Sequence, residues 1–215
     1  KPRGKLCSGG KGVPSLHKGP VFCVDWSPFE HVWYSEDGAG ESHAAQGTEY
    51  GGLIASSSGD RCVVLSTANG HVVCVERLPN TVFGCHWNRL RPGALATACA
   101  DGKIRIYHLK RDRGNGRRGG NSGGSGDRDG TRKFSGASLS LAACLSGHSK
   151  STFRAVWSPH SSTLLASSSN DRTIRVWDTR KTTCASSRSR SSSNASVAVL
   201  RGHRHHVRGL LFHSE

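Results

Sequence analysis

The stretch LSGHSKSTFRAVWSPHSSTLLASSSNDRTIRVWD, from Leu145 to Asp178, decides the fold of this chain. Apolar side chains recur in it as short alternating or continuous runs, a pattern typical of β-strands. These runs lie at 153–157, 164–166 and 174–176. The segments between them, 158–160 and 169–172, contain the Pro, Ser, Asn and Asp residues that favour turns. The stretch is therefore predicted to form three short strands joined by turns.

The same stretch has a Gly-His pair near its start and a Trp-Asp pair at its end, and it resembles a WD repeat, the four-stranded blade of a β-propeller. The resemblance implies a hydrogen-bonded tetrad, in which a turn aspartate holds a histidine and a strand serine joins that histidine to an indole N–H. It assigns these roles to Asp171, His148, Ser169 and Trp177. The implied role is structural rather than catalytic, because the same His and Asp recur as fold determinants in such blades.

Copies of this unit recur along the chain. His17 and Trp26 repeat the spacing of His148 and Trp157, and Trp87 and Asp101 repeat that of Trp157 and Asp171. The positions equivalent between repeats are His17, Trp26, Ser58, Asp60, Trp87, Asp101, Tyr107, Trp157, His203 and Phe212. The tetrad is incomplete in the first repeat, with Ser66 at the Trp position, and degenerate in the second, with Leu78, Cys99 and Tyr107. Trp26, Trp87, Trp157 and Phe212 are expected to pack in the inner strand of each blade.

We expect an all-β fold of about three blades and the start of a fourth, an incomplete part of a larger WD-repeat β-propeller. The expected order is a basic Gly-rich lead-in (1–20), blade 1 (21–78, insertion 34–52), blade 2 (79–145, disordered basic Gly-rich insertion 110–136), blade 3 (146–200, Ser/Arg insertion 184–196) and the start of blade 4 (201–215). Closed propellers have about 4 to 8 blades. The chain opens on Lys1 and has no Met, so we expect a fragment that leaves two blade faces exposed.

Four segments carry a resemblance at the level of the sub-family. VFCVDWSPFEHVW (21–33), FGCHW (83–87), ATACADGKIRIYHL (96–109) and LRGHRHHVRGLLF (200–212) are similar to blades of WD repeat-containing protein 17. That sub-family implies a large intracellular scaffold with further helical sequence downstream. Residues 157–178 are also similar to blades of the histone-binding WD-repeat proteins and of the peroxisomal import receptor for amino-terminal targeting signals.

The chain has a formal net charge of +15, which favours polyanionic partners. Much of the excess lies in 111–133 and 188–208, largely within Gly- and Ser-rich spacers that we interpret as solvated basic loops. Binding of nucleic acid or chromatin through these Arg/Gly and Ser/Arg loops stays an alternative, with strong salt dependence. It is not favoured, because these loops lack aromatic residues for base stacking apart from Phe134. The Ser/Arg tract is either a plain surface loop or a phosphorylation switch.

The sequence offers no clear chemistry of its own. The eight cysteines include no Cys-x-x-Cys pair and are interpreted as reduced, mostly buried thiols. A zinc site of Cys85, His86 and Cys99 is the sharper alternative, but it lacks paired ligand spacing. There is no Gly-x-Ser-x-Gly elbow and no phosphate loop. We therefore predict no catalytic, cofactor or metal residues and no enzymatic activity.

Targeting and membrane signals are also missing from the sequence. Residues 1–18 are basic and Gly-rich rather than apolar, and no run approaches the roughly 18 apolar residues of a membrane span. We expect a cytoplasmic, alternatively nuclear, protein without membrane partners. The predicted function is a non-enzymatic scaffold that binds other proteins, since rigid blades with variable loops present extended binding surfaces. A histone- or peptide-receptor type of propeller is a further alternative.

Overall fold

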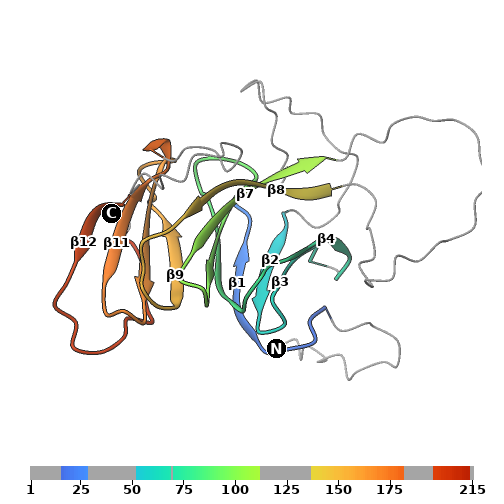
Figure 1. Ribbon diagram of the computed structural model, residues 1–215. Coiled ribbons are helices and arrows are strands. Elements are labelled where there is room, and N and C mark those ends of the chain that lie inside the picture. Colours follow the sequence, from blue (N-terminus) through green and yellow to red (C-terminus); the bar gives the residue numbers. More distant parts are fainter. Residues whose placement is uncertain (1–15, 29–51, 69, 112–136, 182–195, 214–215) are drawn as a thin grey trace, which may run out of the picture.

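The computed structural model describes residues 16–28, 52–68, 70–111, 137–181 and 196–213. Within this part of the chain the strands form three antiparallel sheets of four strands each (Figure 1). Each sheet contains four consecutive strands, paired in chain order. The predicted insertions at 34–52 and 184–196 lie almost entirely outside the described residues. The described part is thus an all-β partial propeller of three blades.

Blade 1 consists of β1 (Val21–Trp26), β2 (Ile54–Ser58), β3 (Cys62–Ser66) and β4 (Val72–Arg77). Blade 2 consists of β5 (Val82–Trp87), β6 (Ala94–Cys99), β7 (Ile104–Arg111) and β8 (Ala137–Leu145). Blade 3 consists of β9 (Thr152–Trp157), β10 (Leu164–Ser169), β11 (Ile174–Asp178) and β12 (Ser196–Leu200), with a short 3-10 helix, η1 (Thr179–Lys181), after β11. The start of the predicted insertion at 110–136 is corrected, since residues 110 and 111 extend β7 in pairing with β8.

The turns between the second and third strands have a common geometry. Each contains an aspartate followed by a residue with positive φ, namely Arg61 (φ 70°), Gly102 (φ 76°) and Arg172 (φ 69°). The arginines adopt this left-handed conformation although glycine tolerates it better. In blade 2 glycine is also required by space, because a Cβ on Gly102 would lie 2.8 Å from the carbonyl oxygen of Lys150. These turns place the three aspartates at corresponding points of the blades.

The core lies between neighbouring blades. Figure 1 shows the sheets side by side, and their first strands adjoin in succession, β1 against β5 and β5 against β9. One buried apolar cluster joins blades 1 and 2 and contains Trp87, which is 1% exposed. A second cluster joins blades 2 and 3 and contains Trp157, which is 3% exposed, and Trp177. Each of the two inner-strand tryptophans, Trp87 and Trp157, is therefore buried beneath the preceding blade.

Two aromatic residues expected to pack in the same way do not. Trp26 is 48% exposed, because no blade of the described chain precedes blade 1 and covers it. Phe212 is 37% exposed and, like the rest of the described segment 201–213, belongs to no strand. A strand requires a neighbour to pair with, and this segment has none among the described residues. The predicted start of a fourth blade therefore forms no strand here, and the segment is held to blade 3 where the Val207 N–H donates to the Ser169 carbonyl oxygen at 3.1 Å.

Among the residues that the structure describes, no helix is long and apolar enough to cross a membrane.

Candidate functional site

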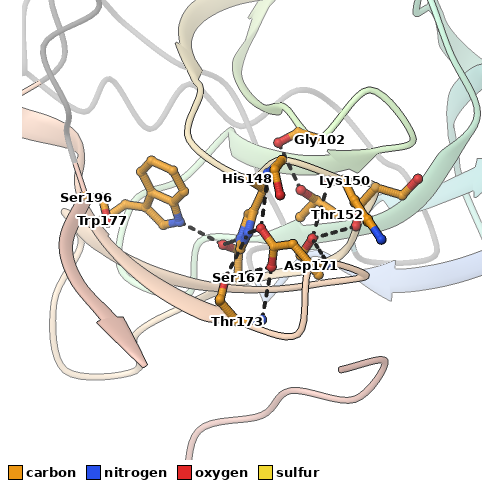
Figure 2. Close-up of polar contacts among 12 residues, drawn as sticks. Gly102, His148, Lys150, Thr152, Ser167, Asp171, Thr173, Trp177 and Ser196 are labelled. Carbon is orange, nitrogen blue, oxygen red and sulfur yellow. Dashed lines mark hydrogen bonds and ion pairs between the residues drawn. The ribbon is translucent and has the colours of Figure 1, made fainter. Parts of the chain in front are cut away.

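The polar centre of blade 3 connects a loop, a turn and two strands (Figure 2). His148, in the loop between β8 and β9, contacts Asp171 Oδ2 through Nδ1 at 2.8 Å and Ser167 Oγ through Nε2 at 2.7 Å. The indole N–H of Trp177 on β11 donates to the same Ser167 oxygen at 2.8 Å. Thr173 completes the turn, since its hydroxyl donates to Asp171 Oδ1 at 2.6 Å. Every polar group of this buried centre therefore has a partner.

The strand serine of this network is Ser167, so the assignment to Ser169 was wrong. Ser169 is the last residue of β10, where its hydroxyl donates to the Ser151 carbonyl oxygen at 2.8 Å and accepts the Asp171 N–H at 3.1 Å. A residue at the strand end faces the turn, whereas Ser167 lies deep enough to meet both the imidazole and the indole. Ser169 thus caps the turn that carries the aspartate.

Blade 1 repeats most of this arrangement with the same correction. His17 contacts Asp60 through Nδ1 at 3.0 Å and Ser56 through Nε2 at 2.8 Å. Ser58 was predicted at the serine position, but its hydroxyl accepts the Asp60 N–H at 3.1 Å, as Ser169 does for Asp171. Ser66 is buried at the Trp position. The first blade therefore has three members of the network and no indole.

Blade 2 holds its turn aspartate by different chemistry. Asp101 accepts two hydrogen bonds from the guanidinium of Arg105, at 2.7 and 3.3 Å, and the Arg105 side chain is 9% exposed. Leu78 and Tyr107 are buried at the His and Trp positions. The serine equivalent is Thr97, whose hydroxyl donates to the Arg105 carbonyl oxygen at 3.3 Å, and not Cys99. Sequence reasoning missed Arg105, and the available signal was an arginine four residues after a turn aspartate in the blade that has Leu78 at the His position.

The electrostatics of the blade 3 network follow from this geometry. Burial opposes ionisation of Asp171, but hydrogen bonds from Thr173 and His148 outweigh it and hold the pKa of this carboxyl well below its ordinary value. Burial also lowers the pKa of His148, although Asp171 partly offsets the effect. At neutral pH the pair is therefore a carboxylate and a neutral imidazole that donates from Nδ1 and accepts from Nε2.

A histidine between an aspartate and a serine has the connectivity of a hydrolytic triad, but this one is built into the core. The side chain of His148 and the whole of Ser167 are 0% exposed, so no substrate carbonyl can approach the hydroxyl. Ser167 Oγ also accepts the Trp177 N–H, so its lone pairs are engaged within the core. The arrangement stabilises the blade and offers no reactive group to solvent.

The alternative zinc ligands are engaged separately. The Cys85 thiol donates to the Ala55 carbonyl oxygen at 3.4 Å, and His86 Nδ1 accepts the Trp157 N–H at 3.3 Å. Cys99 is buried, and burial raises its pKa to about 11. Within the described ranges no three His, Cys, Asp or Glu residues are grouped so that they could hold a metal ion.

Two side chains, each directly preceding an inner-strand tryptophan, accept a backbone hydrogen bond from the next blade. Asp25 accepts the Trp87 N–H at 2.7 Å and pairs with Arg89 at 2.8 Å. In the same way, His86 on β5 accepts the Trp157 N–H of β9. The backbones of the inner strands β5 and β9 are thus each held by the blade before them, in addition to the apolar clusters.

Aromatic rings form a row across the three inner strands. The ring centroids of Phe22 and Phe83 are 5.2 Å apart, and those of Phe83 and Phe153 are 5.3 Å apart. Arg208 continues the row, with its guanidinium carbon 5.4 Å from the Phe153 centroid. Each phenylalanine lies four residues before an inner-strand tryptophan, so the row is a product of the repeat. We call Phe22, Phe83 and Phe153 the phenylalanine row.

The comparison with known families matches part of this arrangement. Residues 139–178 fit the family model described as WD domain, G-beta repeat. This segment is a WD40 repeat. It contains the outer strand β8 of blade 2 and the first three strands of blade 3, so it includes the whole His148 network. The sequence repeat is therefore offset from the structural blade by one strand and ties two blades together covalently.

One curated relative extends the comparison. The histone acetyltransferase type B subunit 2 of Aspergillus fumigatus is 29% identical to this chain over 87 residues, which are 40% of this chain and 16% of that protein. The chain therefore spans about a sixth of the length of the relative that it matches. The WD repeat itself rests on the family model. The resemblance to WD repeat-containing protein 17 stays a prediction.

Proposed function

We propose that this chain is part of a non-enzymatic scaffold that binds other proteins through the phenylalanine row and the charged turns beside it. The single observation that carries the proposal is the row itself. Phe22 is 42% exposed, and Phe83 and Phe153 are only half-buried, although large apolar side chains are usually covered. Three such rings in contact, one from each blade, form a continuous apolar surface of the kind used in protein recognition.

The charges around this row favour an acidic partner. Phe22 lies next to the turn between β2 and β3, since a Cβ on Gly59 would be 3.4 Å from its ring. The turn aspartates are directed inward, to His17, Arg105 and His148. Exposed cations flank the aspartates or belong to the loops and the segment at the same end of the blades, namely Lys18, Arg61, Lys103, Lys150, Arg172, Arg204 and Arg208. An acidic segment with an aromatic or aliphatic anchor therefore suits this surface.

The spacing of the rings argues against nucleic acid at this surface. Phe22 and Phe83 form a tilted pair and Phe83 and Phe153 an edge-to-face pair, with centroids 5.2 and 5.3 Å apart, so a base cannot insert between neighbouring rings. The basic loops on which the alternative of nucleic-acid or chromatin binding rests lie mainly outside the described residues. Protein binding is therefore the proposal, within a cytoplasmic or nuclear protein that makes no use of a membrane. The resemblance to WD repeat-containing protein 17 would place the chain in a large scaffold.

Affinity capture with two matched surface variants tests the proposal. One variant replaces Phe22, Phe83 and Phe153 with Ser, and the other replaces the exposed outer-strand residues Val75 and Leu141 with Ser. Partners captured from cell lysate should fall about tenfold or more with the first variant and persist with the second, with or without nuclease. Capture that survives loss of the row, or that disappears with nuclease, would contradict the proposal.

A second candidate is a histone-binding role, and the observation that favours it is the similarity to a histone acetyltransferase subunit. Basic histone tails would meet the exposed arginines and lysines at like charge, which disfavours binding at the phenylalanine row. Fluorescence polarisation with acidic and with histone-tail peptides separates the candidates. Tighter binding of the histone-tail peptides would support the second candidate over the first.

A further inference from the structure

Two cysteines lie together where blades 1 and 2 meet. Cys23 on β1 and Cys85 on β5 are 8% and 3% exposed. The Cys23 sulfur lies 3.4 Å from the Cys85 carbonyl oxygen, and the Cys85 sulfur lies 3.8 Å from the Cys23 carbonyl oxygen. Each thiol is thus at the backbone of the other residue, and the two side chains interact directly across the adjacent strands β1 and β5.

A cation from the third blade reaches the same point. Arg154 on β9 has its Nη1 2.8 Å from the Cys23 sulfur. Gly84 allows the backbone of β9 to approach closely, because a Cβ on this residue would lie 2.8 Å from the Phe153 carbonyl oxygen and 3.5 Å from the Arg154 Cα. The nearby carboxylate of Asp25 accepts hydrogen bonds from the Trp87 N–H and from Arg89, whereas the Arg154 guanidinium contacts the Cys23 sulfur. Three blades therefore converge on one thiol.

This environment separates the two thiols chemically. The hydrogen bond with Cys85, supported by the charge of Arg154, lowers the pKa of Cys23 to about 6 against the opposing effect of burial. The interaction with Cys23, together with burial, raises the pKa of Cys85 well above its ordinary value. At neutral pH one sulfur is a thiolate beside a guanidinium, and the other keeps its proton. This is the arrangement of an attacking and a resolving cysteine.

We propose that Cys23 and Cys85 are an oxidisable pair, in which Cys23 reacts with a hydroperoxide and Cys85 resolves the product as a disulfide between blades 1 and 2. In the first step the Cys23 thiolate attacks the terminal peroxide oxygen, the O–O bond breaks, and the leaving hydroxide or alkoxide takes a proton from water. Cys23 is thereby oxidised to a sulfenic acid. In the second step the Cys85 sulfur displaces hydroxide, which leaves as water with the Cys85 proton, and the S–S bond forms.

The disulfide changes both the charge that faces Arg154 of blade 3 and the link between blades 1 and 2. A neutral disulfide removes the anion that faces Arg154, so the guanidinium loses its partner in a half-buried site. At the same time the bond joins β1 to β5 covalently. Arg154 lies on β9, so oxidation at Cys23 alters a contact that joins blades 1 and 3. The pair is independent of the proposed binding function, since its chemistry requires no partner.

Peroxide treatment of the purified chain, followed by peptide mapping, tests the pair. The wild type should lose two hydrogens and yield a peptide that joins Cys23 to Cys85. Cys85→Ser should instead accumulate a Cys23 sulfenic acid that dimedone traps, whereas Cys23→Ser should leave Cys85 unmodified. A disulfide at another pair, or dimedone labelling of the exposed Cys144 ahead of Cys23, would overturn the proposal.

The rate of Cys23 oxidation tests the role of the Arg154 guanidinium. Arg154→Met should slow oxidation of Cys23 about threefold or more at pH 6, because the thiolate loses its cation while its intrinsic nucleophilicity rises only partly in return. Should this variant fail to fold, the pH profile of Cys23 alkylation in the wild type decides the same point. A midpoint near 6 supports the assignment, and a midpoint near that of an ordinary thiol refutes it.

Discussion

Blades 2 and 3 hold the same turn by different means. In blade 3 the carboxylate of Asp171 is held by a neutral imidazole, His148, within a network that ends at an indole. In blade 2 the carboxylate of Asp101 is held by the charged guanidinium of Arg105, and apolar Leu78 lies at the position of the histidine. Both turns nevertheless have the same backbone shape. The fold therefore requires a turn carboxylate with partners, rather than one particular set of residues.

The two blades agree in their apolar packing. Trp87 and Trp157 occupy equivalent positions and are both buried beneath the preceding blade. Burial of such a side chain stabilises by several kcal/mol, whereas a single hydrogen bond contributes about 1 kcal/mol net. The aromatic packing that the blades share therefore contributes more to stability than the polar networks in which they differ.

The largest expected effect tests the shared packing. Trp87→Ala and Trp157→Ala should each lower the free energy of unfolding by about 3 to 5 kcal/mol, because each leaves a cavity between two blades. Trp26→Ala is the matched control and should cost less than about 1 kcal/mol, since Trp26 is exposed. Urea unfolding of the three variants measures the difference. Equal losses for all three would mean that burial beneath the preceding blade is not what makes these tryptophans important.

The next largest effect distinguishes the Asp101–Arg105 ion pair of blade 2 from the Asp171–His148 hydrogen bond of blade 3. Asp101→Asn should cost about 3 kcal/mol, because it leaves the largely buried guanidinium of Arg105 without a counter-charge. Asp171→Asn should cost less, about 1 to 2 kcal/mol, because the histidine beside it is neutral and only hydrogen bonds are weakened. Thermal unfolding of both variants gives the comparison. The reverse order would show that Arg105 is better hydrated than its 9% exposure implies.

Much of the fold was predictable from residue spacing. The alternation in 153–157 and the repeat of that pattern before Trp26 and Trp87 depend only on the two-residue period of a strand. These patterns predicted inner strands in all three blades. The outer strand β8 lies within the span predicted for blade 2, where apolar residues return after the Gly-rich segment.

The polar network was harder to predict because a run of three serines fits it in more than one register. Ser167 and Ser169 are two residues apart and point to the same face of β10. Only their positions along the strand relative to His148 and Trp177 decide which hydroxyl joins the network. The exposure of Trp26 likewise depends on a neighbouring blade rather than on its own segment. Contacts between blades, such as Arg154 with Cys23, have no signal in local sequence at all.

A smaller effect sharpens the corrected serine assignment. Ser167→Ala should cost about 2 kcal/mol, because it removes the partner of both His148 and the buried Trp177 N–H. Ser169→Ala is the matched control on the same strand and should cost about 1 kcal/mol, the value of a turn cap. Thermal unfolding decides between them. A larger loss for Ser169→Ala would return the tetrad to the register predicted from sequence.

The smallest expected effect is a loss of stability at low pH, which should differ between blades 2 and 3. Burial lowers the pKa of His108 in blade 2 to about 4, and nearby Arg91 and Lys110 act in the same direction. Burial also lowers the pKa of His148 in blade 3, but there Asp171 opposes the shift. A histidine whose pKa is lower in the folded state takes up its proton first in the unfolded state, so stability is lost as pH falls below about 6.5. His108, where the neighbouring charges reinforce the effect of burial, should therefore contribute the greater acid sensitivity.

Variants of the two blades measure this contribution. Between pH 7 and pH 5 the wild type should lose about 1 kcal/mol through His108, after allowance for solvent screening at this partly exposed side chain. His108→Gln should remove that part of the loss, whereas His205→Gln, at an exposed position, should leave it unchanged. Hydrogen exchange should show blade 2 opening before blade 3 as the solution is acidified. If blade 3 opens first, the carboxylate of Asp171 does not protect the histidine beside it, and the predicted order of acid sensitivity is wrong.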